Sequence, residues 1–73
     1  MAENTAEFTV RGIESSDDVE AVESELAELE GVMGTVIDED SGEAEIDFDY
    51  DLLSAERIEI TVEEAGYEVV DEG

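Results

Sequence analysis

The clearest pattern in the chain is an alternation of apolar and acidic side chains over residues 43–49. A period of two places all the apolar members on one face of a strand. These members are Ala44, Ile46 and Phe48. Residues 32–38 are rich in β-branched side chains and predict a preceding strand, and Asp40-Ser41-Gly42 supplies a turn between the two. The two segments are therefore predicted to pair as a β-hairpin.

Two outer segments also read as strands. In residues 7–13 the apolar Phe8 and Val10 alternate with Thr9 and Arg11, which predicts one apolar and one polar face. Residues 67–70 predict a short last strand.

Helical spacing separates these strands. The first helix is predicted to begin at a group of hydroxyl and carboxylate side chains suited to capping and to the positive end of a helix dipole. These are Ser15, Ser16, Asp17 and Asp18. Its apolar stripe, at spacings of three and four, consists of Val19, Val22, Leu26 and Leu29. Gly31 follows and is predicted to end the helix.

The second helix is predicted to begin after Ser54, an N-cap residue, and to end at Gly66. Its buried stripe is predicted to consist of Ile58, Thr61, Val62 and Ala65. The order β-α-β-β-α-β predicts the α+β class, as a ferredoxin-like sandwich in which two helices cover one face of a four-stranded antiparallel sheet. Residues 1–73 are predicted to be one domain.

The net charge of the chain indicates the kind of solvent in which the protein functions. Asp and Glu account for 25 of 73 residues and are opposed by only two arginines, so the net charge is −23. Such a surface repels itself in dilute buffer, but the Debye length falls to about 3 Å in molar salt. We interpret the acidity as the signature of a halophilic, archaeon-like proteome, with solvent cations as its counterions. Salt-dependent disorder and nucleic-acid mimicry are the alternatives.

Composition also limits the expected cellular compartment and the reactions that the side chains could catalyse. The sequence has no apolar run of membrane-spanning length and no signal peptide, so we expect a cytoplasmic protein without membrane or nucleic-acid partners. Cysteine and histidine are absent, which removes the usual nucleophile and base pairs. We expect no enzyme activity and no catalytic residues. The aromatic residues are predicted at core or core-edge positions; they are Phe8, Phe48, Tyr50 and Tyr67.

The apolar positions resemble a known family in their spacing. Gly12-Ile13, the run Leu26-x-x-Leu29-x-Gly31-Val32 and the terminal Gly66-Tyr67-Glu68-Val69 are similar to the heavy-metal-associated domain of copper chaperones and metal-transporting ATPases. The resemblance covers nearly the whole chain and implies the same ferredoxin-like fold. It also implies copper or another heavy metal as the family's cargo.

The family's metal loop, Gly-Met-x-Cys-x-x-Cys, is altered in this chain. The resemblance aligns the two cysteines with Ser15 and Asp18, and the methionine with Ile13. Cu(I) prefers thiolate and thioether ligands, and Zn²⁺ is usually held by thiolate or imidazole. We therefore predict no bound cofactor and no soft-metal transfer.

Oxygen ligands leave a second interpretation open. Glu14, Ser15, Asp17 and Asp18 are candidate ligands for Ca²⁺ or Mg²⁺, although the same residues suit a helix start. The acidic turn at residues 38–43 lacks the spacing of an EF-hand and is predicted to be a solvated hairpin tip.

Three functions are compatible with this sequence. The first is a protein-binding or adaptor module that docks through residues 12–18 and the first helix. The second is residual metal binding or transport through oxygen ligands in that loop. The third is a structural or regulatory domain that oligomerises through the open face or an edge of its sheet, where Thr9, Arg11, Glu45 and Asp47 are predicted to lie.

Overall fold

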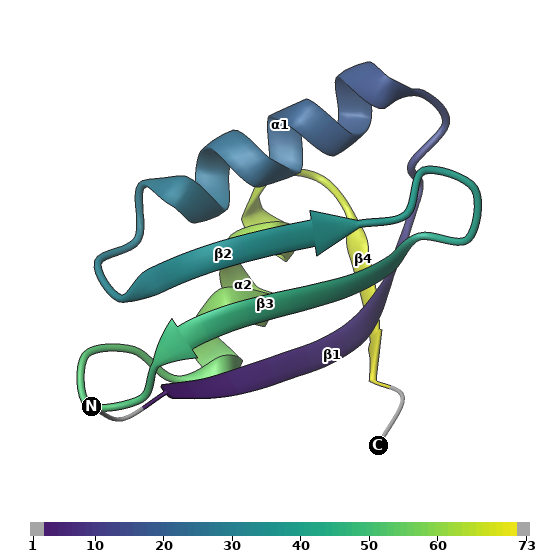
Figure 1. Ribbon diagram of the computed structural model, residues 1–73. Coiled ribbons are helices and arrows are strands. Elements are labelled where there is room, and N and C mark those ends of the chain that lie inside the picture. Colours follow the sequence, from purple (N-terminus) through teal and green to yellow (C-terminus); the bar gives the residue numbers. More distant parts are fainter. Residues whose placement is uncertain (1–2, 72–73) are drawn as a thin grey trace.

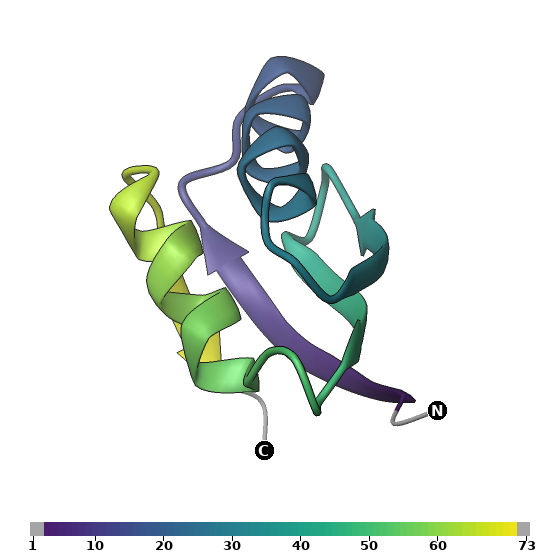
Figure 2. The same ribbon diagram turned by 90° about the vertical axis from the view of Figure 1, so that its left-hand side faces the viewer.

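The computed structural model describes residues 3–71 and contains the six elements in the predicted order (Figure 1). The strands are β1 (Glu3–Arg11), β2 (Val32–Ile37), β3 (Glu43–Asp49) and β4 (Glu68–Asp71). The helices are α1 (Ser16–Ala27) and α2 (Ala55–Glu64). The strands form one antiparallel sheet in the order β2-β3-β1-β4. Both helices lie against the same face of this sheet (Figure 2), so the predicted ferredoxin-like fold is confirmed.

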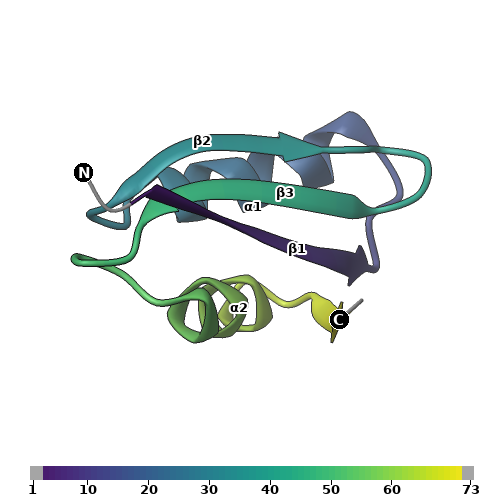
Figure 3. The same cartoon turned by 60° about the horizontal axis from the view of Figure 1, so that its bottom comes forward.

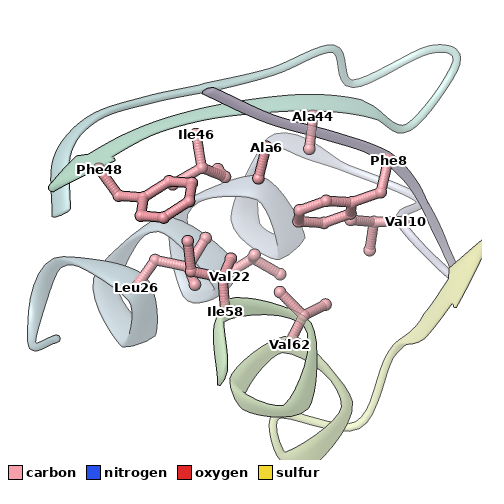
Figure 4. Close-up of a cluster of buried hydrophobic side chains, with 10 residues drawn as sticks. All are labelled: Ala6, Phe8, Val10, Val22, Leu26, Ala44, Ile46, Phe48, Ile58 and Val62. Carbon is pink, nitrogen blue, oxygen red and sulfur yellow. The ribbon is translucent and has the colours of Figure 1, made fainter. Parts of the chain in front are cut away.

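The core lies between the sheet and the helices, because the alternation in each central strand directs apolar side chains to one face. Figure 4 shows the sheet residues facing those of α1 and α2 across this layer. The buried members are Ala6, Phe8, Val10, Val22, Leu26, Ala44, Ile46, Phe48, Ile58 and Val62. The stripes predicted for the two helices supply Val22, Leu26, Ile58 and Val62, which confirms the helical periodicity.

Pairing with β3 makes β1 longer than its own pattern predicts. The strand begins at Glu3 rather than at residue 7, because Glu3 lies opposite Asp49 and the ladder continues along β3 to Thr9. It ends at Arg11 rather than at residue 13. Polar residues such as Asn4 and Thr5 carry little strand signal by themselves, so the partner strand decides this boundary.

The end of α1 also differs from the prediction. The helix stops at Ala27, so Leu29 and Gly31 lie in the turn before β2 and not at the helix end. Leu29 still packs half-buried on the core. Gly31 has φ +108°, and a Cβ there would lie 3.1 Å from the Cβ of Leu53. The glycine therefore allows the connection before β2 to pack closely on the connection after β3, and it does not terminate the helix.

The remaining differences are small except for one aromatic residue. Strand β2 ends at Ile37, one residue before the predicted end, and β4 covers Glu68–Asp71 instead of residues 67–70. Phe8 and Phe48 are buried and Tyr67 packs half-buried on the core, as predicted. The prediction for Tyr50 is wrong, because its side chain is 59% exposed. It follows directly after β3, where the alternation no longer fixes a face.

Candidate functional site

The loop between β1 and α1, residues 12–15, lies at one end of the sheet together with the β2–β3 turn (Figure 1). It leaves β1 through Gly12, whose φ of +107° is readily adopted only by glycine. A Cβ at this position would lie 3.4 Å from the Cδ1 atom of Tyr67. Ile13, at the position of the family's methionine, is half-buried against the core. The loop therefore contacts the core through Ile13 and lies against the Tyr67 ring at Gly12.

Asp18 holds this loop in place through both carboxylate oxygens. The backbone N–H of Glu14 donates to Oδ2 at 2.9 Å. The hydroxyl of Tyr67 donates to Oδ1 at 2.7 Å. These bonds join the loop, the first turn of α1 and the residue before β4, and the bond between Asp18 and Tyr67 spans 49 positions of the chain. Asp18 is therefore the centre of the site.

The electrostatics of this pair follow from the hydrogen bond. The Tyr67 hydroxyl stabilises the charged carboxylate and lowers the pKa of Asp18 below its ordinary value of 3.8, and the Glu14 amide adds to this effect. In turn the Asp18 carboxylate raises the pKa of Tyr67 above 10.0, because the phenol keeps the proton that it donates. At neutral pH the pair is an ionised acid accepting from a protonated phenol.

The sheet register explains why Tyr67 meets the loop. Arg11, the last residue of β1, pairs with Glu68, the first residue of β4. Their side chains form an exposed ion pair at 3.2 Å. The loop after β1 and the residue before β4 are therefore neighbours. Sequence reasoning missed this role of Tyr67, because it did not predict that the first and last strands pair.

The other candidate ligands of the loop are not gathered around a common point. Glu14, Ser15 and Asp17 are exposed, and Asp18 is half-buried and bonded as described. Within residues 3–71, no three acidic side chains are grouped closely enough to hold a metal ion. A hard cation at Asp18 would compete with two existing hydrogen bonds. The donors of this loop also do not suit Cu(I), since hydroxyl and carboxylate oxygens replace the two thiolates.

In the second acidic segment, residues 38–43, the side chains of Asp38 and Ser41 accept hydrogen bonds from the backbone of the turn. The Oδ1 atom of Asp38 accepts from the N–H groups of Asp40 and Ser41, at 2.8 and 3.3 Å. The carbonyl oxygen of Gly42 accepts from the N–H of Val10 at 2.7 Å. The residues of this turn before Gly42 are exposed, which agrees with the predicted hairpin tip. The Asp38 carboxylate therefore stabilises the turn itself.

The helices of the described segment, 12 and 10 residues long, are too short and too polar to cross a membrane. Their exposed faces are acidic, and no Asp or Glu with a described side chain is buried.

Known proteins share both the sequence and the fold. The copper chaperone CopZ of Staphylococcus haemolyticus is 35% identical over 62 residues, which cover 85% of this chain and 91% of that protein. The copper binding domain of the P-type ATPase HMA7 superposes with a TM-score of 0.85 at 26% identity, with 89% of this chain and 88% of that one covered. Oxidized MerP of Ralstonia metallidurans superposes with a TM-score of 0.90 at 22% identity, over 99% of this chain and all of that one, and supports the fold alone.

The family match extends over most of the chain. The model of the family described as the heavy-metal-associated domain matches residues 7–68, a range that includes the altered loop and ends just after Tyr67. The apolar spacing, the topology and the position of the loop agree with this match. The chain therefore belongs to the heavy-metal-associated domain family, and it lacks the cysteines of that family's metal loop.

Proposed function

We propose that this protein is a heavy-metal-associated domain that binds another protein and does not carry Cu(I). The observation that carries the proposal is the use of Asp18. This residue aligns with the family's second cysteine, and its two carboxylate oxygens accept hydrogen bonds from the Glu14 N–H and the Tyr67 hydroxyl. Hydrogen bonds within the chain thus do what a chelated ion would do for a metal loop: they join the loop to the first turn of the helix.

The docking surface would consist of residues 12–18 and the first turns of α1. Its exposed side chains include Glu14, Asp17 and Glu20, which supply only negative charge. A partner for this surface would present Lys or Arg, and opposite charge would mainly speed the encounter and select the partner. The copper binding domain of HMA7 is part of a P-type ATPase, so a P-type ATPase is the class of partner to test first.

The metal part of the proposal is tested by competition for Cu(I) with a chromophoric chelator. The wild-type protein should leave the coloured complex unchanged at stoichiometric concentration. The triple variant Ile13→Met, Ser15→Cys, Asp18→Cys restores the family's ligands on the same fold and should bleach the complex. Withdrawal of Cu(I) by the wild type would refute the proposal. If the triple variant also left the complex unchanged, the missing thiols would not be the reason why the wild type does not bind Cu(I).

The docking part is tested by site-specific photo-crosslinking in the native host. A photoreactive residue replaces Asp17 in the proposed surface and, in a control, the exposed Glu63 on α2. A discrete adduct should form from position 17 only, and Glu20→Lys should weaken it by charge reversal. Identical adducts at both positions, or no adduct at position 17, would contradict docking through this loop.

We also infer that the fold is adapted to concentrated salt. Carboxylates are spread over both helices and over β1, β3 and β4, and Arg11 forms an ion pair with one of them, Glu68. Dilution of salt therefore strengthens repulsion over the whole surface. Circular dichroism and amide shift dispersion should be retained in molar KCl and lost in dilute buffer. Full retention of structure in dilute buffer would overturn this inference.

A further inference from the structure

The most unusual segment of the surface is the strand β2. Residues 31–37 contain no charged side chain and form the longest such run in a chain that is 37% charged. This run is also at the edge of the sheet, since the strand order is β2-β3-β1-β4 (Figure 3). Edge strands are usually protected by charged side chains, because an open edge can pair with another chain. The chain has carboxylates almost everywhere else and none here.

The backbone of this edge is oriented to accept a further strand. The N–H of Asp38 donates to the carbonyl oxygen of Glu43 at 2.9 Å, which fixes the hydrogen-bonding phase of the hairpin. In an antiparallel ladder, bonded and non-bonded pairs alternate. The N–H and C=O groups of Ile37 and Thr35, which pair with Ala44 and Ile46, are therefore directed away from β3.

Exposed apolar side chains gather along the same edge. Met33 is 47% exposed and Val36 is 65% exposed, and both belong to β2. Leu52 is 58% exposed, and its Cβ lies 3.2 Å from the position that a Cβ would take at Gly31, just before the strand. The other edge of the sheet, β4, also exposes one apolar side chain, Val70 at 40%, but this strand begins with Glu68, which is in an ion pair. The two edges are therefore chemically different.

The ends of β2 indicate what would cover it. Glu28 and Glu30 precede the strand, and Asp38 and Asp40 follow it, all with exposed side chains. A second copy paired antiparallel along β2 would bring Glu30 of one molecule near Asp38 of the other, and such like-charge contacts are unfavourable. A segment that is uncharged in its centre and basic at both ends would complement the uncharged strand and the acidic residues on both sides of it.

We propose that the β2 edge binds an extended segment of a partner protein as a fifth, antiparallel strand, with an apolar or β-branched centre and Lys or Arg at both ends. The open backbone groups at Thr35 and Ile37 would supply the ladder, and Val36 and Met33 would pack against side chains of the added strand. This surface does not include residues 12–18, so the inference is independent of the proposed function.

The proposal is tested by NMR titration of the labelled full chain in molar KCl with short synthetic peptides. The first peptide has a Val-Thr repeat flanked by Lys-Arg at each end. The second has the same centre flanked by glutamates. A third and a fourth carry N-methyl groups, either on the amides that face β2 or on the alternate amides. Shifts should saturate and be confined to β2 and its flanks, and the glutamate flanks should weaken binding about threefold, because molar salt screens much of the repulsion.

Two protein variants complete the experiment. Thr35→Pro removes an outward N–H from an edge position where proline is tolerated, and it should abolish binding of the basic peptide. Val70→Thr on the opposite edge is the matched control and should leave binding unchanged. If Thr35→Pro does not fold, the two N-methylated peptides still test whether binding uses a backbone ladder. Only the peptide that is blocked on the amides facing β2 should fail to bind.

Three outcomes would overturn the proposal. The first is equal binding of both N-methylated peptides, which would exclude a backbone ladder. The second is a response confined to residues 12–18, which would place the basic peptide on the loop. The third is concentration-dependent protection of β2 amides in the free protein without any response to peptide, which would identify a second copy as the occupant.

Discussion

The two helices of this protein begin with the same kind of residue and are held in different ways. At α2, the Oγ atom of Ser54 accepts from the N–H of Arg57 at 3.2 Å, an ordinary N-cap. At α1, the N-cap Ser15 makes no such side-chain bond. The acid three positions later, Asp18, instead accepts from the loop before the helix and from Tyr67.

The start of one helix is therefore stabilised by a local contact and the start of the other by a tertiary contact. The first N–H groups of any helix lack partners within the helix, and a serine at the N-cap position accepts a hydrogen bond from one of them. The start of α1 depends instead on Tyr67, which lies beyond the whole of α2. The helix start that corresponds to the family's metal loop is therefore fixed by a contact across the molecule, and the other start is fixed by its own sequence.

The largest effect on this comparison should come from Asp18→Ala. The change removes both bonds that tie the loop to α1 and to Tyr67, so the melting temperature should fall by roughly 5 to 10 °C. Asp17→Ala is the matched control, because it removes one neighbouring carboxylate without a described side-chain bond and should change the melting temperature little. Equal effects of the two variants in thermal melts would show that Asp18 acts only through its charge.

The contribution of Asp18 should also depend on pH in a defined direction. Its pKa is lowered in the folded state by the Tyr67 hydroxyl and the Glu14 amide, so its stabilisation is complete above its ordinary pKa of 3.8. The stabilisation is lost as the pH falls through the lowered folded pKa. The difference in melting temperature between wild type and Asp18→Ala should therefore be constant near neutrality and shrink below about pH 4. A difference that grew in acid would contradict this assignment.

Ser54→Ala should have the next largest effect. Loss of the cap bond to the Arg57 N–H should destabilise the fold by about 1 kcal/mol. Chemical denaturation in molar KCl measures the change, and Ser54→Asp, which keeps an acceptor at the N-cap, is the control and should retain most of the stability. If alanine and aspartate behaved alike, the hydroxyl would not be acting as a cap.

A smaller effect is expected on the ionisation of Tyr67. Its pKa is raised above 10.0 by the bond to Asp18, so the stability gained from this bond is complete below pH 10 and is lost as the pH rises through the raised value. In a Tyr50→Phe background, ultraviolet absorbance reports on Tyr67 alone. Its titration midpoint should lie above 10.0 and move down when Asp18→Ala is added. A midpoint that did not respond to Asp18→Ala would exclude the bond in solution.

Ser15→Ala should have the smallest effect. Because the Ser15 hydroxyl makes no cap bond, its loss should change the unfolding free energy by no more than about 0.5 kcal/mol. The same denaturation experiment as for Ser54→Ala measures it, so the two serines can be compared directly. A loss as large as that of Ser54→Ala would mean that Ser15 caps α1 in solution.

The sequence by itself predicted those parts of the protein that depend on local periodicity. The alternation in residues 43–49 has only one strand register that buries Ala44, Ile46 and Phe48 together, so this strand was predicted with its observed bounds. The Ser54 cap was also predicted, because donor and acceptor are only three positions apart. The absence of thiols from the loop follows from composition alone.

Only the tertiary structure decided how the loop is held. The bond between Asp18 and Tyr67 joins residues 49 positions apart, and no local pattern distinguishes Asp18 from the other acids at the start of α1. The exposure of Tyr50 and the extension of β1 to Glu3 likewise depend on neighbours from distant parts of the chain. Periodicity determines which face of an element is buried, but a contact between two chain ends exists only once the sheet has brought them together.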